Sequence, residues 1–405
     1  MSSSGFDETI RKFTEMMVDK IKQVGTDWEK PWFTPSCTGV PQNLSGRHYK
    51  GINSVVLTME MENKGYQTPV FMTATQASME HVKILKHERP IEVIYWNHDV
   101  YEKNTGKKIP YEEYEKLDRD KQQNYIIQSD MKTHNVYNIQ QTEYPKLYPE
   151  IWENIKNKFM IRNLTDEKGM FKSPLLDTLI NNQKWICPIK TEIGDNVLYS
   201  TKNKLIIIPP KNQFIKGEEF YISLLHEMAH STGDIDHLSR DLSTVFGSPQ
   251  YAKEELIAEL TSAVCGKELG IYPNIKEDNA MYLKGWLNSI TESPEYLFSI
   301  LAEVGKASFL IKEKIMDMKQ YMSIEDRFMN AAIQADKKEL TQLKEIGYNP
   351  TLREIETLNK CTKDQATVKT LKETFNIDLN PEFLKTEKNN LNRQNYMNMS
   401  NGLSL

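Results

Sequence analysis

The sequence predicts an α+β protein with two mixed units and an all-helical C-terminal extension. Before residue 320, short runs rich in β-branched and aromatic residues alternate with helical patterns. The proline-containing segment YPKLYPE at 144–150 separates two such groups. From Ile324 to Phe383, apolar residues recur every three or four positions. We therefore place domains at 1–145, 146–320 and 321–384, followed by a tail at 385–405.

Composition narrows the class of protein. The formal net charge of −5 excludes a strongly basic nucleic-acid coat, so any nucleic-acid contact must come from a local patch. The four cysteines form no C-x-x-C pair, which excludes a zinc ribbon and disfavours a disulfide scaffold. The polar N-terminus and the absence of a long apolar run predict neither a signal peptide nor a membrane partner. We expect a cytoplasmic protein.

The first unit begins with an amphipathic helix predicted over 7–24, followed by a loop dense in proline, glycine and aromatic residues. A helix is predicted at 54–64. Strands are predicted near 68–73, at 91–96 with an extension to 101, and at 136–139. The intervening KNTGKKIPYEEYEKLDRDKQQN is predicted to be a charged surface insertion, and YPKLYPE a linker.

The second unit is predicted to begin with a helix at 151–159. A strand pair follows at 196–200 and 204–208, turning at TKN, and further helices are predicted at 218–232, 253–269, 281–289 and 295–317. The C-terminal extension is predicted to be helical with a turn at GYNPT, and its two halves are too weakly similar to predict a repeat. The Asn-rich tail is expected to be disordered.

The segment LLHEMAHSTG carries the pattern H-E-x-x-H as His226, Glu227 and His230. Residues four apart lie on the same helix face, so both histidines can bind one Zn²⁺. Glu227 lies about 100° around the helix, where it is suited to act as the general base that takes a proton from an attacking water. Chance occurrence of the pattern is on the order of 0.01 per chain of this composition. The motif therefore predicts a zinc site rather than two incidental histidines.

A catalytic zinc needs a third protein ligand, and two candidates compete for this role. Asp236 completes H-E-x-x-H-x-x-G-x-x-D, the spacing of metzincin-like sites. Glu255 lies on the next predicted helix, as in thermolysin-like peptidases, with Glu259 four residues later to hydrogen-bond a ligating histidine. We favour Glu255; Asp236 stays an alternative, as do Glu254 or Glu259 as direct ligands. A solvated helix face is the ordinary meaning of such an acidic run.

Several blocks around these motifs resemble ArdC-type antirestriction proteins. YSTKNKLIIIPPKNQF, EEFYISLLHEMAHSTG, YAKEELIAEL and NAMYLKGWLNSI resemble the family's metallopeptidase-like domain. WEKPW, GVPQNLSGRHYKGIN, TPVFMTATQA and VYNIQQTEY resemble its single-stranded-DNA-binding domain. The resemblance covers about residues 6–315. It implies a DNA-binding domain joined to a zincin-like domain similar to SPRTN and ImmA peptidases, carried by mobile elements. Ser231 departs from the aromatic residue that usually follows the second histidine.

The positive and negative charges of the N-terminal residues are nearly balanced, so charge alone would not bind DNA. A single DNA strand could still be bound if its bases stack on exposed aromatic rings and a few lysine and arginine side chains contact its phosphates. The alternative is that the rings form core, the commoner location of Trp and Tyr, and that Asn43 caps a turn. The candidate DNA-binding residues are Trp28, Lys30, Trp32, Asn43, Arg47, Tyr49, Lys50, Asn53 and Gln76.

These observations predict a mobile-element antirestriction protein that binds single-stranded DNA and carries a zinc-dependent peptidase acting on proteins near DNA. One alternative is a non-enzymatic protein that shields single-stranded DNA and has a structural zinc. Another is an ImmA-like regulatory peptidase that cleaves a repressor and uses its N-terminal unit as a protein adaptor. The sequence does not identify the protein substrate.

Overall fold

The computed structural model describes residues 36–114, 117–166, 168–243, 248–271, 294–362 and 364–380, together with positions 11, 14–16, 18, 19 and 22. These last positions are helical, as predicted for 7–24. The helix predicted at 281–289 and the tail at 385–405 lie outside the described residues. Within the described ranges, no helix is long and apolar enough to cross a membrane.

The N-terminal unit contains a five-stranded sheet in the order β1-β2-β5-β3-β4. β1 and β2 are parallel, and the other pairs are antiparallel. The strands are β1 (Gln42–Asn43), β2 (Val70–Thr73), β3 (Ile91–Glu102), β4 (Lys108–Ile109) and β5 (Tyr125–Asn138).

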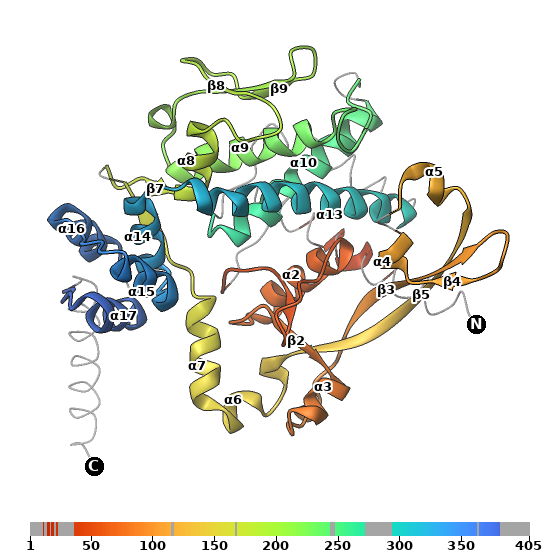
Figure 1. Ribbon diagram of the computed structural model, residues 1–405, viewed down its shortest axis with the longest axis horizontal. Coiled ribbons are helices and arrows are strands. Elements are labelled where there is room, and N and C mark those ends of the chain that lie inside the picture. Colours follow the sequence, from red (N-terminus) through yellow and green to blue (C-terminus); the bar gives the residue numbers. More distant parts are fainter. Residues whose placement is uncertain are drawn as a thin grey trace.

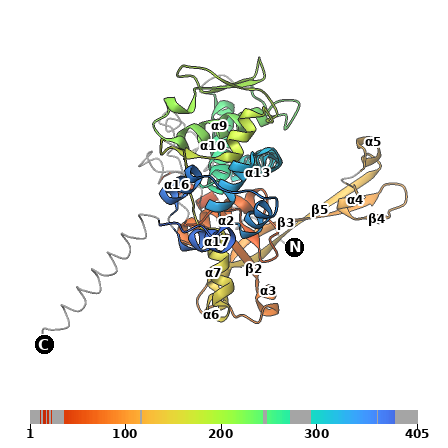
Figure 2. The same cartoon turned by 60° about the vertical axis from the view of Figure 1, so that its left-hand side comes forward.

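The predicted strand at 136–139 is wrong in its start, because β5 begins eleven residues earlier, at Tyr125. β5 pairs with β3 from Ile91↔Val136 to Glu102↔Tyr125, forming an arm that extends from the body (Figure 2). The predicted surface insertion is the end of this arm and contains β4, α4 (Tyr111–Tyr114) and α5 (Arg119–Gln122). Much of the arm is exposed, so β5 lacks the alternating apolar pattern by which a half-buried strand is predicted.

Helices cover the body of this sheet and contribute to its core. They are α2 (Ile52–Lys64), α3 (Ala74–Met79), the 3₁₀ turn η1 (Ile139–Gln141), α6 (Tyr144–Leu147) and α7 (Pro149–Lys158). The predicted linker YPKLYPE is therefore helical, with a proline in the first turn of both α6 and α7, where a missing N–H costs nothing. Tyr144, Trp152 and Phe159 are buried in the hydrophobic core beneath the sheet. The segment is therefore part of the N-terminal unit and not an exposed linker between units.

The second unit contains a three-stranded sheet in the order β8-β10-β9. The predicted strand pair is confirmed as an antiparallel β9–β10 pair, and β8, which was not predicted, runs parallel to β10. α10 packs along α9, and α13 packs across both (Figure 1). The elements are β6 (Leu164–Thr165), β7 (Phe171–Lys172), α8 (Pro174–Asn181), β8 (Ile189–Thr191), β9 (Leu198–Ser200), β10 (Leu205–Ile208), η2 (Lys211–Gln213), α9 (Gly217–Thr232), α10 (Pro249–Glu268), α13 (Pro294–Asp317) and η3 (Met318–Tyr321).

The described part of the C-terminal extension forms four helices, as its apolar spacing predicts, and they pack around a hydrophobic core that also includes Leu164 of β6. Each helix begins after a residue whose side chain accepts a hydrogen bond from a first-turn amide, which explains where the helices start. The helices are α14 (Ile324–Ile333), α15 (Lys337–Glu345), α16 (Leu352–Cys361) and α17 (Gln365–Phe375), and GYNPT lies between the second and third.

The two mixed units also contact each other directly. The buried Lys267, near the C-terminal end of α10, donates from Nζ to the carbonyl of Gly39 at 2.9 Å. Gly305 of α13 packs on Gly51, at the start of α2, so closely that a Cβ at Gly305 would lie 2.4 Å from the Cα of Gly51. Glycine is required here for space.

Candidate metal centre

The H-E-x-x-H motif lies on α9, which is buried along most of its length. Apolar side chains fill positions around the whole helix, as expected for a helix inside a core. Gly217 begins the helix against the backbone of Phe171, where a Cβ would lie 2.5 Å from a carbonyl oxygen. His226 and Glu227 are 6% and 5% exposed, so the motif is not on a solvated face.

α10 presents an acidic face to α9. Ser248 caps this helix by accepting from the amide of Tyr251, and Pro249 occupies its first turn. Glu254, Glu255 and Glu259 are 6–7% exposed. The alternative of a solvated helix face is therefore wrong for these three carboxylates.

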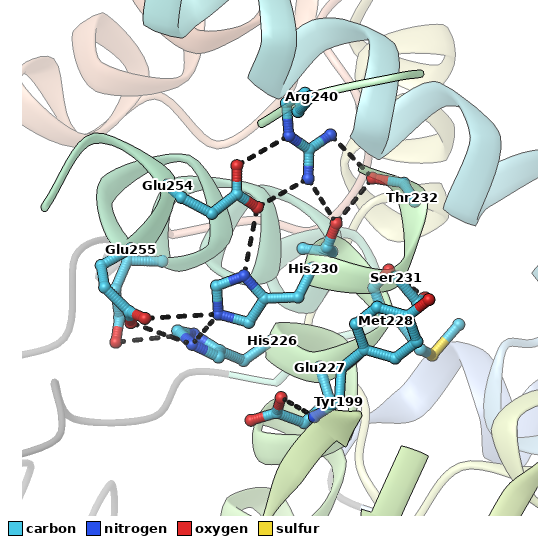
Figure 3. A network of polar contacts seen from close by, with 12 residues as sticks. Tyr199, His226, Glu227, Met228, His230, Ser231, Thr232, Arg240, Glu254 and Glu255 are labelled. Atoms are coloured by element: carbon cyan, nitrogen blue, oxygen red, sulfur yellow. Dashed lines mark hydrogen bonds and ion pairs between the residues drawn. The ribbon is translucent and has the colours of Figure 1, made fainter. Parts of the chain in front are cut away.

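Three side chains meet between α9 and α10 (Figure 3). The Nε2 atoms of His226 and His230 lie 3.0 Å apart. The carboxylate oxygens of Glu255 lie 3.5 Å from Nε2 of His226 and 3.6 Å from Nε2 of His230. Donor atoms about 2.1 Å from one ion in a tetrahedral arrangement are separated by about 3.4 Å. The spacing of these two nitrogens and one carboxylate therefore fits a divalent metal ion.

A second set of contacts orients His230. Nδ1 of His230 lies 3.1 Å from Glu254, and Arg240 donates to both oxygens of Glu254 at 2.8 and 2.9 Å. Arg240 also donates to the carbonyl of Ala229 at 2.8 Å, so it fixes the end of α9 as well. Glu254 thus contacts Nδ1 of His230 and orients Nε2 of the same ring toward Glu255. Sequence reasoning missed Arg240, because no spacing rule places a residue of this loop against Glu254.

Glu259 lies on the far side of the other histidine. Its Oε1 is 3.7 Å from Nδ1 of His226, which is longer than a hydrogen bond. Asp236 lies outside the group: its carboxylate is 69% exposed and pairs with Lys204 at 2.5 Å. The structure thus brings Glu255 to the two histidines and leaves Asp236 at the surface.

The electrostatics of the group follow from several buried charges in one place. Burial lowers the pKa of His230, but the hydrogen bond to Glu254 and the neighbouring carboxylates outweigh this and raise the pKa to about 9. Burial raises the pKa of Glu255, but the two histidines and the side chain of Tyr251 outweigh this and hold the pKa at about 2. Glu255 is therefore a carboxylate at neutral pH, the form that binds a metal.

Glu227 points away from the three donors, toward the edge of the small sheet (Figure 3). Its Oε2 accepts a hydrogen bond of 2.7 Å from the backbone N–H of Tyr199 on β9. β9 is the outer strand of the order β8-β10-β9, so this amide lies on the edge that β10 does not pair with. Glu227 is consequently placed beside the donor group and next to an edge of β9 that pairs with no other strand in the part of the chain that the structure describes.

The predicted DNA-binding residues have more varied environments. Asn43 accepts from the amide of Arg47 at 2.8 Å in a turn, and Gln76 closes a capping box with Thr73 at the start of α3. Asn53 exchanges two hydrogen bonds with the backbone of Ile94. These three amides are engaged within the N-terminal unit.

Tyr49, Lys50 and Arg47 lie on the segment before α2. Tyr49 is half-buried and packs edge-on against Phe71, whereas Arg47 and Lys50 are exposed. Trp28, Lys30 and Trp32 fall outside the described residues.

Replacing Arg240 with alanine is expected to weaken both the fold and the metal centre. The variant leaves the buried Glu254 without its cation, a change that typically costs about 3–5 kcal/mol of unfolding free energy. It also frees the imidazole of His230, and loss of such an orienting contact lowers metal affinity about 10- to 100-fold. Urea unfolding and metal titration measure the two effects. Lys337→Ala, which removes an exposed ion pair with Glu373, is the matched control and should change both little. Equal stability of the two variants would contradict this role for Arg240.

Comparison with known proteins first defines the class of the second unit. Residues 175–303 match the model of the zincin-like metallopeptidases, a fold that implies a divalent metal, and this range contains His226, His230 and Glu255. Residues 7–137 match the N-terminal domain of anti-restriction factor ArdC. The chain therefore contains an ArdC-type N-terminal domain followed by a zincin-like domain, as its sequence blocks predict.

Solved structures and relatives agree with this architecture. The metal-free crystal structure of the antirestriction protein ArdC from plasmid R388 is 24% identical, with a TM-score of 0.57 over 76% of this chain and 98% of that one. Its Mn(II)-bound structure is 23% identical, with a TM-score of 0.55 over 76% and 97%. DNA primase TraC of Escherichia coli is 28% identical over 72% of this chain, which spans only 26% of TraC. The uncharacterized protein y4eC of Sinorhizobium fredii is 23% identical over 71% of this chain and 86% of its own length.

Proposed function

We propose that this protein is an antirestriction factor of a mobile element that binds single-stranded DNA and hydrolyses peptide bonds in proteins near that DNA. The observation that carries the proposal is the convergence of His226, His230 and Glu255 in a buried group, with Glu227 beside it. We place the protein in the bacterial cytoplasm, where incoming DNA meets restriction enzymes.

We propose zinc as the metal. Two imidazoles and one carboxylate form a donor set common in catalytic zinc sites. The ArdC structure that contains Mn(II) makes manganese the principal competitor. When bound, the metal supplies a Lewis acid that polarises a carbonyl oxygen. His226, His230 and Glu255 hold it, and Glu254 with Arg240 keeps one of these ligands in its orientation.

Glu227 and β9 carry the rest of the chemistry. The carboxylate of Glu227 accepts a proton from the attacking water and later passes it to the leaving amine. The free edge of β9 is suited to hold an extended polypeptide by backbone hydrogen bonds, next to Glu227. A strand edge that ends at a general base supports a peptide substrate over a small molecule.

A proteolysis assay with and without DNA tests the proposal. The full-length protein loaded with zinc is incubated with unfolded casein and with DNA-binding proteins, in the presence or absence of an oligothymidylate. We expect cleavage that a chelator abolishes, that zinc restores, and that the oligonucleotide stimulates for substrates bound to the same strand. A gel shift at increasing salt measures DNA binding separately. Failure of the full-length chain to bind the oligonucleotide at low salt would refute the DNA part, and metal-independent cleavage would refute the peptidase part.

A further inference from the structure

A pocket of about 430 Å³ lies where the two mixed units meet, away from the metal centre. It is formed by the segment before α2, the first turn of α2, the end of α7, the C-terminal end of α10, and α13. α2 and α13 lie side by side there (Figure 1). Its α10 residues, Cys265 and Glu268, are at least ten positions beyond Glu255, which corresponds to about 15 Å or more along a helix. Its volume is within the range of small-molecule sites, about 300–1,000 Å³.

One wall of the pocket is the N-terminus of α2. Gly51 is the N-cap, no side chain caps the helix, and its first turn holds no acidic residue. The backbone amides and the helix dipole therefore favour an anion at this end. Ser54, in the same turn, lines the pocket and is 6% exposed. Among the described residues its hydroxyl has no hydrogen-bond partner. A buried hydroxyl without a partner at an uncapped helix start indicates a missing hydrogen-bonding ligand.

Positive charges converge on the same pocket from three elements. Burial and the charges of Lys312, Lys158 and Lys50 together hold the pKa of His48 below its ordinary value. Two carboxylates also line the pocket. Glu268 pairs with Lys312 at 2.8 Å, and Glu313 is exposed.

Lys50 and Lys158 remain available as cations. Across the ranges that the structure describes, neither is paired with a carboxylate; each ammonium lies over an aromatic ring instead, Lys50 over Phe309 and Lys158 over Phe159. An anion at the start of α2 would therefore find unpaired ammonium groups.

The pocket also contains an aromatic surface. Phe309 of α13 lines the pocket and is 40% exposed, and Nζ of Lys50 lies 4.6 Å from its ring centroid. Tyr49 also lines the pocket. A nucleobase that stacks on this ring would displace the Lys50 ammonium from the ring face, and the ammonium would then lie next to the phosphate.

We propose that this pocket binds one nucleotide of a single DNA strand, with its phosphate at the start of α2 and its base on Phe309. Ser54 donates its hydroxyl to the phosphate, and Lys50 neutralises the charge. The proposal rests on the single-stranded-DNA binding proposed above and adds its location. Because the pocket is lined by both units, a bound strand contacts the zincin-like domain as well as the N-terminal one.

The test compares four variants of the full-length protein by fluorescence anisotropy with a labelled oligothymidylate, over a series of salt concentrations. Phe309→Ala is expected to weaken binding about 5- to 150-fold, the effect of losing one base stack. Lys50→Ala is expected to weaken binding and to reduce the salt slope by about 0.7, the value for one phosphate contact on a single strand. The matched controls are Tyr321→Ala and Lys184→Ala, which separate a lysine–aromatic pair of the same kind (4.8 Å) outside this pocket. They should bind as the wild type does.

Ser54→Ala provides an independent check, because its hydroxyl has no hydrogen-bond partner among the described residues and its loss should not reduce stability. We expect several-fold weaker binding of the oligonucleotide and of thymidine monophosphate, with an unchanged melting temperature. If Phe309→Ala and Lys50→Ala bind with wild-type affinity and salt slope, the proposal that this pocket binds the nucleotide is refuted, whereas the proposal that the protein binds single-stranded DNA is not. If the protein binds thymidine monophosphate but not the oligonucleotide, a nucleotide pocket is supported and the proposed binding of single-stranded DNA is refuted. Binding of neither would refute both.

Discussion

Replacement of Glu255 by alanine is expected to remove the metal from the protein. Its carboxylate lies 3.5–3.6 Å from the facing nitrogens of His226 and His230, the separation of atoms that share one ion. Because the loss of an orienting contact alone lowers metal affinity about 10- to 100-fold, loss of a direct ligand should lower it by more than about 100-fold. Competition for zinc with a chromophoric chelator measures the affinity.

Asp236→Ala is the control for this prediction, since both acids are candidates on sequence spacing. The Asp236 carboxylate is exposed and pairs with Lys204, so its removal should leave the metal affinity within about twofold of wild type. Glu259→Ala should have an intermediate effect, because its carboxylate faces His226 without reaching hydrogen-bond distance. If Asp236→Ala lost the metal and Glu255→Ala kept it, the centre described between α9 and α10 would be wrong.

Glu227→Gln is expected to abolish peptide hydrolysis while leaving the metal in place. A positioned general base contributes about 10²- to 10⁴-fold to the rate, and glutamine cannot accept the proton. Glu227 is not among the three facing donors, and a glutamine carbonyl can still accept from the amide of Tyr199. We therefore expect wild-type metal affinity and melting temperature together with a loss of cleavage of about 100-fold or more.

The same variant separates enzymatic from non-enzymatic protection of DNA. Introduced with a mobile element into a restricting host, Glu227→Gln should fail to protect if cleavage is the working activity. Protection equal to that of the wild type would show that hydrolysis is dispensable and would favour the shielding alternative. Glu218→Gln, in the first turn of the same helix and outside the facing donors, is a matched control for the loss of a negative charge.

The helices of the site were predictable because their signals are local. α9 and α10 are long runs of helix-forming residues with no proline beyond the first turn, and the separation of His226 from His230 is set by the helix itself. The choice between Asp236 and Glu255 depends on the loop after α9, which keeps Asp236 at the surface with Lys204. No spacing rule gives the path of such a loop, and for the same reason Arg240 could not be found from the sequence.

Other features escaped prediction because they depend on contacts between distant segments. β5 pairs with β3 along a largely exposed arm, so its side chains carry no alternating pattern. The prolines of YPKLYPE predict a linker from the sequence. In the structure the segment is helical, because Tyr144 and Trp152 are buried in the core of the N-terminal unit. Asn53 is a candidate DNA contact by residue type, and no local sequence pattern indicates its two hydrogen bonds with the backbone of Ile94. Residue type alone does not distinguish these outcomes.

The buried hydrogen bond from Lys267 to Gly39 has a consequence for the modularity of the chain. α10 carries Glu255 in its first half and Lys267 near its end, so a single rigid helix is fastened to both units. Burial already lowers the pKa of the Lys267 ammonium group. Separation of the two units would remove its hydrogen-bond acceptor, the carbonyl of Gly39. The two units are therefore expected to unfold as one cooperative block. The two units match separate families in sequence, but we do not expect them to unfold separately.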